Sequence, residues 1–440
     1  MHGQRCVNII ISSMDYKLLQ SLSYKQHPLN LTTPSGVKEN PKVQDLVEIL
    51  PRQHIKFLTY NMFMRPPPVK TNASDFKDAR LDEFVKTLDD FDIICFQEVF
   101  STMNTRQQRL ITYAKKAGLI YHVVNPYPGL FSGYVVDGGL VILSRFPIIA
   151  SEFEPYDYGV VSDALTCKGV LYAKILINDK HVLHLFNTHT QASYFHDDLE
   201  TFVATFETRL MQIKHARRYV ERKTEDMGEN DLVIFSGDFN ANGPTNKAGA
   251  KNYIEHLQGR PNFDQFLHAL ETEYQTLIKI MSRSGRDELI DCSAAANNGI
   301  CQVTFADITY DENGKPLPVE SVITGEEDLL TCQCLDYIFV INPNKSKPLF
   351  AAPQNPTEEN PLMQDANVDD PAKRDTDSQT SSEEKNGEDS NRDKLIKAEK
   401  GDSKLIVNVK KTKVEKFFIE GFPFTQLSDH FGISTEIEIV

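Results

Sequence analysis

Polar side chains follow several apolar runs of this 440-residue chain at the point where each run ends. HIKFLTYN ends in an amide, FDIICFQE in a carboxylate, HVLHLFNTH in an imidazole, and DLVIFSGDFN in a carboxylate and an amide. An aspartate begins LDYIFVI, and SDH precedes the last run, GISTEIEIV. The residues are Asn61, Glu98, His189, Asp238, Asn240, Asp336, Asp429 and His430. If the runs are β-strands, these side chains converge at one edge of a sheet and can form one site.

Carboxylates, amides and imidazoles at one edge indicate metal-assisted chemistry. Carboxylate and carbonyl oxygens are the donors that a hard ion such as Mg²⁺ prefers, and Mg²⁺ keeps some of its water ligands. Each motif alone has a plainer interpretation, namely a polar strand end that meets water or an Asx turn that caps the next segment. The joint occurrence of the motifs at successive strand ends favours a site.

The elements that must position these residues are strands and helices in alternation. GGLVILS, GVLYAKILI and LDYIFVI have the pattern of buried strands. Apolar residues at helical spacing predict a helix in DARLDEFVKTLDD and a long amphipathic helix from Leu199 to Val220. Several strands follow one another without a helix between them, unlike a simple βα repeat. We therefore predict an α/β fold of two mixed sheets packed face to face, with helices outside.

Composition divides the chain into a domain and two other segments. Residues 1–50 lack a sustained period and are predicted to be an extension before a domain at 51–440. Residues 345–405 interrupt this domain, and residues 351–402 hold 14 Asp and Glu against 7 Lys and Arg. This polar composition predicts a disordered, acidic insertion. It separates LDYIFVI from KLIVNVKKTKVEKFFIE, so we expect it to replace a hairpin turn.

Bulk composition narrows the classes of function. The net charge of −15 counts mildly against a general nucleic-acid binder. Cys95 and Cys167 lie in or beside apolar runs, and the pair Cys332 and Cys334 lacks a standard zinc spacing, so reduced thiols are expected. No run approaches the ~18 apolar residues of a membrane span. We expect a cytoplasmic protein that can visit membranes peripherally.

Seven motifs together resemble those of one superfamily, the endonuclease/exonuclease/phosphatase superfamily of metal-dependent phosphodiesterases. They are LTYN, FQEV, GGLVILSRFPI, NTHTQA, SGDFN, LDYIF and SDH. The similarity covers roughly residues 55–440 apart from the insertion. It implies a deoxyribonuclease-like fold, a four-layered αββα sandwich, which agrees with the two mixed sheets predicted above.

The resemblance also implies roles for the metal-binding residues. Glu98 would hold the essential Mg²⁺, which Mn²⁺ could replace. Asn61 would lie beside Glu98, and Asp429 would complete the metal site.

For catalysis, the resemblance implies in-line attack of an activated water on a phosphodiester. Asp238 and Asn240 would position the water and the phosphate. His430, oriented by Asp336, would accept the proton of the water. His189 would protonate the leaving group or donate a hydrogen bond to an oxygen of the pentacoordinate species.

Three segments favour the neutral sphingomyelinase branch of the superfamily, which releases ceramide and phosphocholine from sphingomyelin. NTHTQA, CKGVLYAKI and GGLVILSRFPI resemble elements of that branch. The inositol phosphatase branch expects a Trp before Gly-Asp, and this chain has no Trp. The expected partner is thus a membrane phospholipid, without a stable nucleic-acid complex. A nuclease with the same site and an inactive lipid-binding scaffold remain the alternatives.

Three further features have both a functional and a plainer interpretation. Asp163 and Lys168 could pair beside the site, with Lys168 meeting substrate phosphate, or could be an exposed pair of little consequence. The aromatic loop YPGLFSGY could enter a bilayer interface or could pack under a loop. The lysines of the run KKTKVEK could contact anionic lipid or could be a solvated strand face.

Overall fold

Two mixed sheets of six strands each form the centre of the computed structural model, which describes residues 54–72, 74–129, 132–194, 199–251, 257–343 and 403–440. The first sheet has the order β13 (Leu405–Glu415), β14 (Gly432–Ile439), β1 (His54–Met64), β2 (Ile93–Val99), β4 (Val141–Ser144) and β3 (Tyr121–Val124). The second has the order β5 (Ile148–Pro155), β6 (Gly169–Asn178), β7 (His181–His189), β8 (Leu232–Asp238), β12 (Asp336–Asn342) and β9 (Glu288–Asp291). One pair in each sheet is parallel, β1 with β2 and β7 with β8, and the other pairs are antiparallel.

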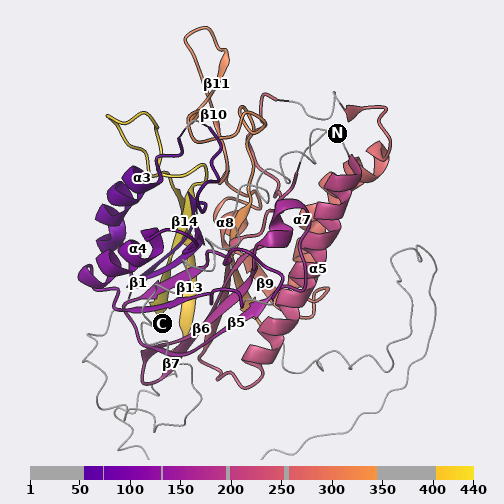
Figure 1. Ribbon diagram of the computed structural model, residues 1–440. Helices are drawn as coiled ribbons and strands as arrows, with labels where there is room; N and C mark the ends of the chain where they lie inside the picture. The colour runs from indigo at the N-terminus through magenta and orange to yellow at the C-terminus, as the bar shows by residue number, and fades with distance from the viewer. Residues whose placement is uncertain (1–53, 73, 130–131, 195–198, 252–256, 344–402) are drawn as a thin grey trace, which may run out of the picture. The chain divides into compact units, whose positions relative to one another are not determined.

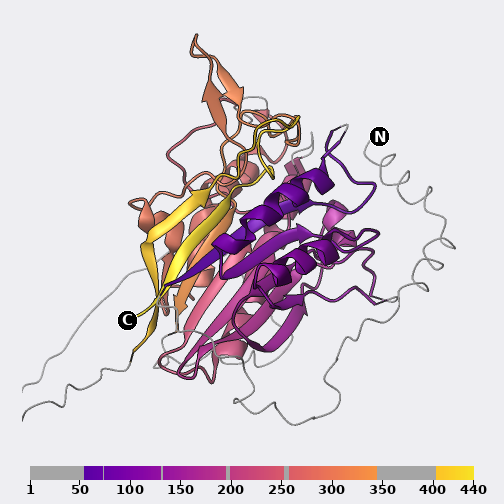
Figure 2. The same ribbon diagram turned by 90° about the vertical axis from the view of Figure 1, so that its left-hand side faces the viewer.

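Helices cover the outer face of each sheet. The first sheet is covered by α3 (Lys77–Phe84) and α4 (Arg106–Lys116), and the second by α5 (Leu199–Thr224) and α7 (Phe263–Met281). Figure 1 shows these two helix pairs on opposite sides of the sheets, and Figure 2 gives the perpendicular view. A short helix, α8 (Cys292–Ala296), and a hairpin of β10 (Ile308–Tyr310) and β11 (Pro316–Pro318) complete the described elements. The predicted α/β class and αββα sandwich are confirmed.

The apolar core has three layers because both sheets are buried on both faces. Along β1, Ile55 and Phe57 face the second sheet, whereas Leu58 and Tyr60 pack toward α3 and α4. Strands buried on both faces have nearly continuous apolar sequences, as β1 and β2 do. The polar residues that interrupt these runs at their ends are therefore the exception that points to a site.

The expectation of a hairpin turn at residues 345–405 was wrong. β12 lies in the second sheet, where β8 and β9 already occupy both of its edges, so it has no edge left for β13. β13 pairs instead with β14 in the first sheet. The predicted extension at 1–50 and the insertion, apart from residues 403–405, lie outside the described residues.

The remaining predictions concern the two helices, the state of the thiols and membrane-spanning segments. The helix in DARLDEFVKTLDD is α3 followed by a 3-10 helix, Val85–Asp90, and the long helix is α5. The six cysteines within the described ranges are free thiols. In the described part of the chain, we find no helix with the length and apolarity of a membrane span.

Candidate active site

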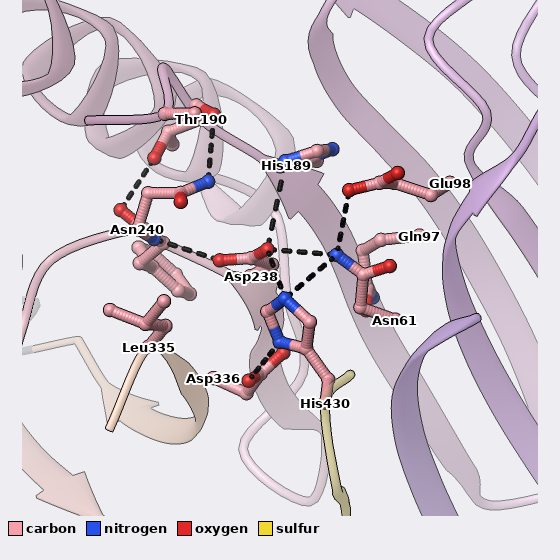
Figure 3. Close-up of polar contacts among 12 residues, drawn as sticks. Asn61, Gln97, Glu98, His189, Thr190, Asp238, Asn240, Leu335, Asp336 and His430 are labelled. Carbon is pink, nitrogen blue, oxygen red and sulfur yellow. Dashed lines mark hydrogen bonds and ion pairs between the residues drawn. The ribbon is translucent and has the colours of Figure 1, made fainter. Parts of the chain in front are cut away.

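The strand-end residues lie together at one edge of the two sheets (Figure 3). In the first sheet, the parallel pair β1 and β2 sets Asn61 in register with the residue before Glu98. In the second, the parallel pair β7 and β8 sets His189 opposite Asp238, and antiparallel β12 sets Asp336 opposite Asp238 as well. Because paired parallel strands end at the same edge, strand pairing brings side chains from distant parts of the sequence into contact.

Asp238 is the centre of the hydrogen-bond network in Figure 3. Its Oδ2 accepts from Nδ2 of Asn61 at 2.9 Å and lies 3.8 Å from Nε2 of His430 and 3.6 Å from Nε2 of His189. Its Oδ1 accepts from the backbone N–H of Asn240 at 2.9 Å. The Asx turn of the G-D-x-N motif is thus present. It uses only Oδ1 of Asp238, and Oδ2 faces the other residues of the site.

His430 lies between two carboxylates. Its Nδ1 lies 2.9 Å from Oδ2 of Asp336, and the ring of Phe305 packs against the imidazole with 4.8 Å between centroids. Burial alone would lower the pKa of His430, but the charges of Asp336 and Asp238 outweigh it and raise the pKa well above its ordinary value. Burial and the charge of Asp336 raise the pKa of Asp238 to about 6, against the opposing charge of His430. The two carboxylates therefore stabilise the imidazolium form of His430.

The same three side chains have the spacing of a metal site. One donor atom each from Asp238, Asp336 and His430 lies within 4.8 Å of the others. Nδ1 of His430 is already paired with Asp336, so Nε2 is the ring nitrogen that remains for a metal ion or for a water molecule. The group therefore fits either a metal ion or the transfer of a proton from water.

Glu98 supplies an oxygen that suits a divalent cation. Its Oε1 accepts from Nδ2 of Asn61 at 3.2 Å, while its buried Oε2 has no hydrogen-bond partner among the residues that the structure describes. The backbone of Glu98 is left-handed, with φ 57°, which is strained for a residue other than glycine. The backbone of Gly139 packs closely against that of Glu98. A side chain at position 139 would collide with it, because its Cβ would lie 3.0 Å from Cα of Glu98. A buried carboxylate oxygen without a partner is costly unless a cation compensates it, so these residues fit a hard metal ion.

Asp429 adds a second carboxylate to this part of the site. Its Oδ1 accepts from Oγ of Ser428 at 3.2 Å. Burial raises the pKa of Asp429 to about 7; the charge of His430 opposes this rise and that of Glu98 adds to it. The charge of Glu98 thus disfavours ionisation of the buried Asp429, and a bound divalent cation would relieve this repulsion.

Asn61 occupies the predicted position, but the nitrogen of its amide, and not the oxygen, faces the carboxylates of the site. Nδ2 faces Glu98 and Asp238, whereas Oδ1 accepts from the backbone N–H of Phe63 at 3.0 Å. In this orientation Asn61 is a donor between two carboxylates. A role for Asn61 as an oxygen ligand of the metal stays a prediction.

His189 differs from His430 in its charge. Burial and the charges of Lys168 and His430 lower the pKa of His189 well below its ordinary value, so its ring is neutral at neutral pH. The Nζ of Lys168 lies 3.2 Å from Nε2 of His189. Because an ammonium group can only donate, Nε2 accepts and the ring proton resides on Nδ1. This Nδ1–H is buried and has no protein partner within the described ranges.

Lys168 and Asp163 are buried beside His189, so their interpretation as an exposed pair is wrong. Nζ of Lys168 donates to Oδ2 of Asp163 at 2.7 Å and to the carbonyl of Thr190 at 2.7 Å. With His189 as its third neighbour, the ammonium group has three contacts and orients the imidazole. Direct binding of substrate by Lys168 and Asp163 stays a prediction.

Two residues of this site were not singled out in the sequence. The carbonyl of Thr190 accepts from both Lys168 and Nδ2 of Asn240, the latter at 3.2 Å, and so links the two loops. Phe305 packs on His430 and joins a small apolar cluster with Leu335. Thr190 stands inside the NTHTQA motif, but no sequence pattern marks a backbone carbonyl as a hub, and none marks Phe305.

The chain is similar to the model of one protein family and to several named proteins. Residues 58–340 match the model of the Endonuclease/Exonuclease/phosphatase family. A sphingomyelinase of Dictyostelium discoideum is 32% identical over 393 residues, which cover 84% of this chain and 76% of that protein. Sphingomyelinase C of Bacillus cereus is 27% identical over 198 residues, which cover 43% of this chain and 57% of that enzyme.

Solved structures with a similar chain path are more distant in sequence. The beta toxin of Staphylococcus aureus has 18% identity and a TM-score of 0.46, covering 87% of this chain and 99% of that chain. TDP2 of D. rerio, complexed with a single-strand DNA product, has 13% identity and a TM-score of 0.44, covering 88% and 99%.

The first prediction separates chemistry from folding. His430→Ala and Asp238→Ala should each lower kcat by at least ~10²-fold, the lower range for loss of a general base, while the melting temperature stays nearly unchanged. His184→Ala is the matched control, because His184 is a buried histidine of β7 that contacts Tyr172 and Asp231 instead of the site. This control should keep its turnover. Melting curves that collapse with His430→Ala and Asp238→Ala would show that these residues are structural.

Proposed function

The chain belongs to the endonuclease/exonuclease/phosphatase family, and from this premise we propose that it is a divalent-metal phosphodiesterase that cleaves sphingomyelin into ceramide and phosphocholine. The observation that carries the proposal is the pair of histidines on either side of Asp238. In this proposal His430, paired with Asp336 through Nδ1, is the proton acceptor, and His189, held by Lys168, is the hydrogen-bond donor. The Nε2 atoms of the two rings lie 3.8 Å and 3.6 Å from Oδ2 of Asp238. An in-line displacement at phosphorus needs these two functions at opposite ends of the reacting group.

The lipid substrate is supported by the relatives. The Dictyostelium discoideum protein that shares 32% identity is named a sphingomyelinase, and the alignment spans most of both chains. The bacterial relatives named sphingomyelinase C align over a shorter stretch. An inactive scaffold is disfavoured, because every strand-end residue predicted for the site lies in it.

Glu98 and Asp429 would hold the divalent cation, proposed to be Mg²⁺ with Mn²⁺ as a substitute. When bound, the cation would neutralise charge that develops on the phosphoryl oxygens. The free Oε2 of Glu98 and the raised pKa of Asp429 support this assignment. Neither residue is placed to exchange protons with the attacking water in this proposal.

His430 accepts the proton of the attacking water through Nε2. This nitrogen lies 3.5 Å from Nδ2 of Asn61 and 3.8 Å from Oδ2 of Asp238, which together orient the water. Asp336 fixes the opposite nitrogen and stabilises the imidazolium that results. Only the neutral form of His430 can accept this proton, and the raised pKa makes that form a stronger base. General base catalysis typically contributes ~10²–10⁴-fold.

His189 and Asn240 stabilise the phosphoryl group from the other side. The ring of His189 is oriented by Lys168, and in this proposal its N–H donates to a phosphoryl or leaving-group oxygen. The low pKa of His189 favours a hydrogen-bond donor over a full proton donor. The amide nitrogen of Asn240 has two hydrogens, of which Thr190 accepts one, so the second can donate to substrate.

Peripheral membrane contact from the cytoplasmic side belongs to the same proposal. In the aromatic loop, Tyr127 is 60% exposed, whereas the hydroxyl of Tyr134 donates to the carbonyl of Tyr156 at 2.7 Å. Leu130 and Phe131 lie outside the described residues. The loop thus offers one exposed ring and one that is anchored.

The lysines of β13 and the segment after it are exposed, but two of them are already paired. Lys413 lies 3.0 Å from Glu415, and Lys416 lies 3.0 Å from Asp307. Lys410 and Lys411 remain as the candidates for attraction to anionic lipid, each contributing ~1 kcal/mol near a membrane surface.

Metal binding should depend on pH through Asp429. Its pKa of about 7 means that the carboxyl is protonated below pH 7, and a protonated carboxyl is a poor metal ligand. Titration calorimetry should therefore show Mg²⁺ or Mn²⁺ affinity falling by up to about tenfold per pH unit below pH 7. Asp429→Asn should bind more weakly and lose this pH dependence. Affinity that is constant from pH 6 to 8, or full activity in EDTA, would remove this metal site.

The substrate class is tested by a panel. Purified protein should release phosphocholine from sphingomyelin in mixed micelles faster than from phosphatidylcholine, and should nick supercoiled plasmid slowly at equal enzyme concentration. The acidic net charge supports this order, because enzymes that hold polyanions usually cluster Lys and Arg. Glu98→Gln, which removes the carboxylate for the metal, is the inactive control. Rapid nicking without phosphocholine release would replace the lipid assignment by a nuclease.

A further inference from the structure

Beneath His189 and Asn240, the two outer helices α5 and α7 are joined by a buried ion pair that the proposed chemistry does not use. Arg209 of α5 is 0% exposed and Glu273 of α7 is 2% exposed. The guanidinium donates through Nε to Oε1 of Glu273 at 2.8 Å and through Nη2 to the same oxygen. Removing two charges from water is expensive, so such a pair indicates a requirement other than stability alone.

Each partner of the ion pair also binds one loop of the site. Nη1 of Arg209 donates to the carbonyl of Gln191, two residues after His189, at 2.7 Å. Oε2 of Glu273 accepts from the backbone N–H of Asn242, two residues after Asn240, at 3.1 Å. The pair therefore spans the gap between the loop that follows β7 and the loop that follows β8.

A third residue strengthens the anchor on the loop after β7. Gln212, also on α5, accepts from the backbone N–H of Gln191 at 2.8 Å, so both backbone groups of Gln191 are held by one helix. The side chain of Gln191 in turn accepts from the backbone N–H of Val160, in the segment that leads to Asp163. Helix α5 thus holds, directly or through Gln191, the two segments that Lys168 contacts, one with Asp163 and the other with Thr190.

The two loops need such anchors because they lack regular structure at the point of function. Asn240 is held in a left-handed conformation, with φ 49°, and the carbonyl of Thr190 serves both Asn240 and Lys168. A displacement of either loop would move the donors that face the phosphoryl group. Misplacement of catalytic groups by ~1 Å can cost about 10²-fold in rate.

We propose that Arg209 and Glu273 are positioning residues that fix the distance between the His189 and Asn240 loops and thereby set turnover. This proposal rests on the proposed phosphodiesterase function. Glu98 and Asp429 come from β2 and from the segment before β14, which the ion pair does not hold. The pair should accordingly affect kcat and leave metal affinity unchanged.

The chain offers a matched control on the same helix. Arg217 lies on α5 eight residues after Arg209 and is 3% exposed. Its Nε donates to the carbonyl of Met281 at 2.8 Å, and its guanidinium pairs with Asp287 and Glu221. This second buried ion pair also ties α5 to the end of α7, but its partners lie outside the site loops.

The experiment compares Arg209→Lys with Arg217→Lys, and Glu273→Gln with Asp287→Asn. Lysine keeps the positive charge but cannot reproduce the branched donor set, and glutamine keeps the shape of Glu273 without its charge. For each variant, kcat, KM, melting temperature and Mg²⁺ affinity by calorimetry are measured with the full chain. Amide hydrogen exchange is followed by mass spectrometry in peptides that cover residues 188–193 and 239–243.

All four variants should lower the melting temperature. Only Arg209→Lys and Glu273→Gln should lower kcat, by at least about tenfold, with Mg²⁺ affinity within about twofold of the unmodified chain. The same two variants should speed exchange in the two loop peptides. If Arg209→Lys does not fold, Glu273→Gln alone carries the test.

Two outcomes would overturn the proposal. One is turnover and loop exchange in Glu273→Gln equal to those of the unmodified chain. The other is an equal loss of kcat in Arg217→Lys, which would make the effect a general consequence of destabilisation. If the unmodified chain cleaves no phosphodiester, the proposed function fails, whereas the exchange measurement, which needs no substrate, still tests the anchoring of the loops.

Discussion

Each sheet contains one parallel pair of strands, β1 with β2 and β7 with β8, and the site depends on where these pairs end. Parallel neighbours terminate at the same edge, so β1 and β2 deliver an amide and a carboxylate there, and β7 and β8 deliver an imidazole and a carboxylate. Face-to-face packing of the two sheets then brings Asn61 of one within 2.9 Å of Asp238 of the other. The helices outside fix the loops that follow these strands.

This arrangement buries several charged side chains. The site has two parts, which differ in how these charges are balanced. On one side, His430 lies between Asp336 and Asp238, and a positive charge on its ring would offset one of the two negative charges. On the other, Glu98 and Asp429 have no buried cation bonded to their carboxylates among the described residues. The charges of His430, Arg65 and Arg80 only partly offset the burial of Asp429, whose pKa stays raised, and a divalent ion would stabilise its carboxylate further. This difference supports the proposed roles, which are proton transfer at His430 and metal binding at Glu98 and Asp429.

Much of the fold and the membership of the site could be predicted from the sequence. Strands buried on both faces have nearly continuous apolar runs, so polar residues such as Glu98 and Asp238 are conspicuous at their ends. The sequence of a strand does not indicate which distant strand it pairs with. For this reason the expected hairpin of β12 and β13 was wrong. The burial of Lys168 and the Arg209–Glu273 pair also depend on tertiary packing between segments that share no local pattern. The direction of the Asn61 amide depends on the backbone N–H of Phe63 and on the carboxylates of Glu98 and Asp238, which only the fold brings together.

The central claim is that the metal binds at Glu98 and Asp429 while His430 stays free for proton transfer. Crystals soaked in Mn²⁺ and measured at the manganese absorption edge would locate the ion directly. We expect an anomalous peak next to Oε2 of Glu98 and the carboxylate of Asp429, with Nδ1 of His430 still bonded to Asp336. A peak bonded to His430, Asp336 and Asp238 would contradict it, because the proposed base would then be a metal ligand.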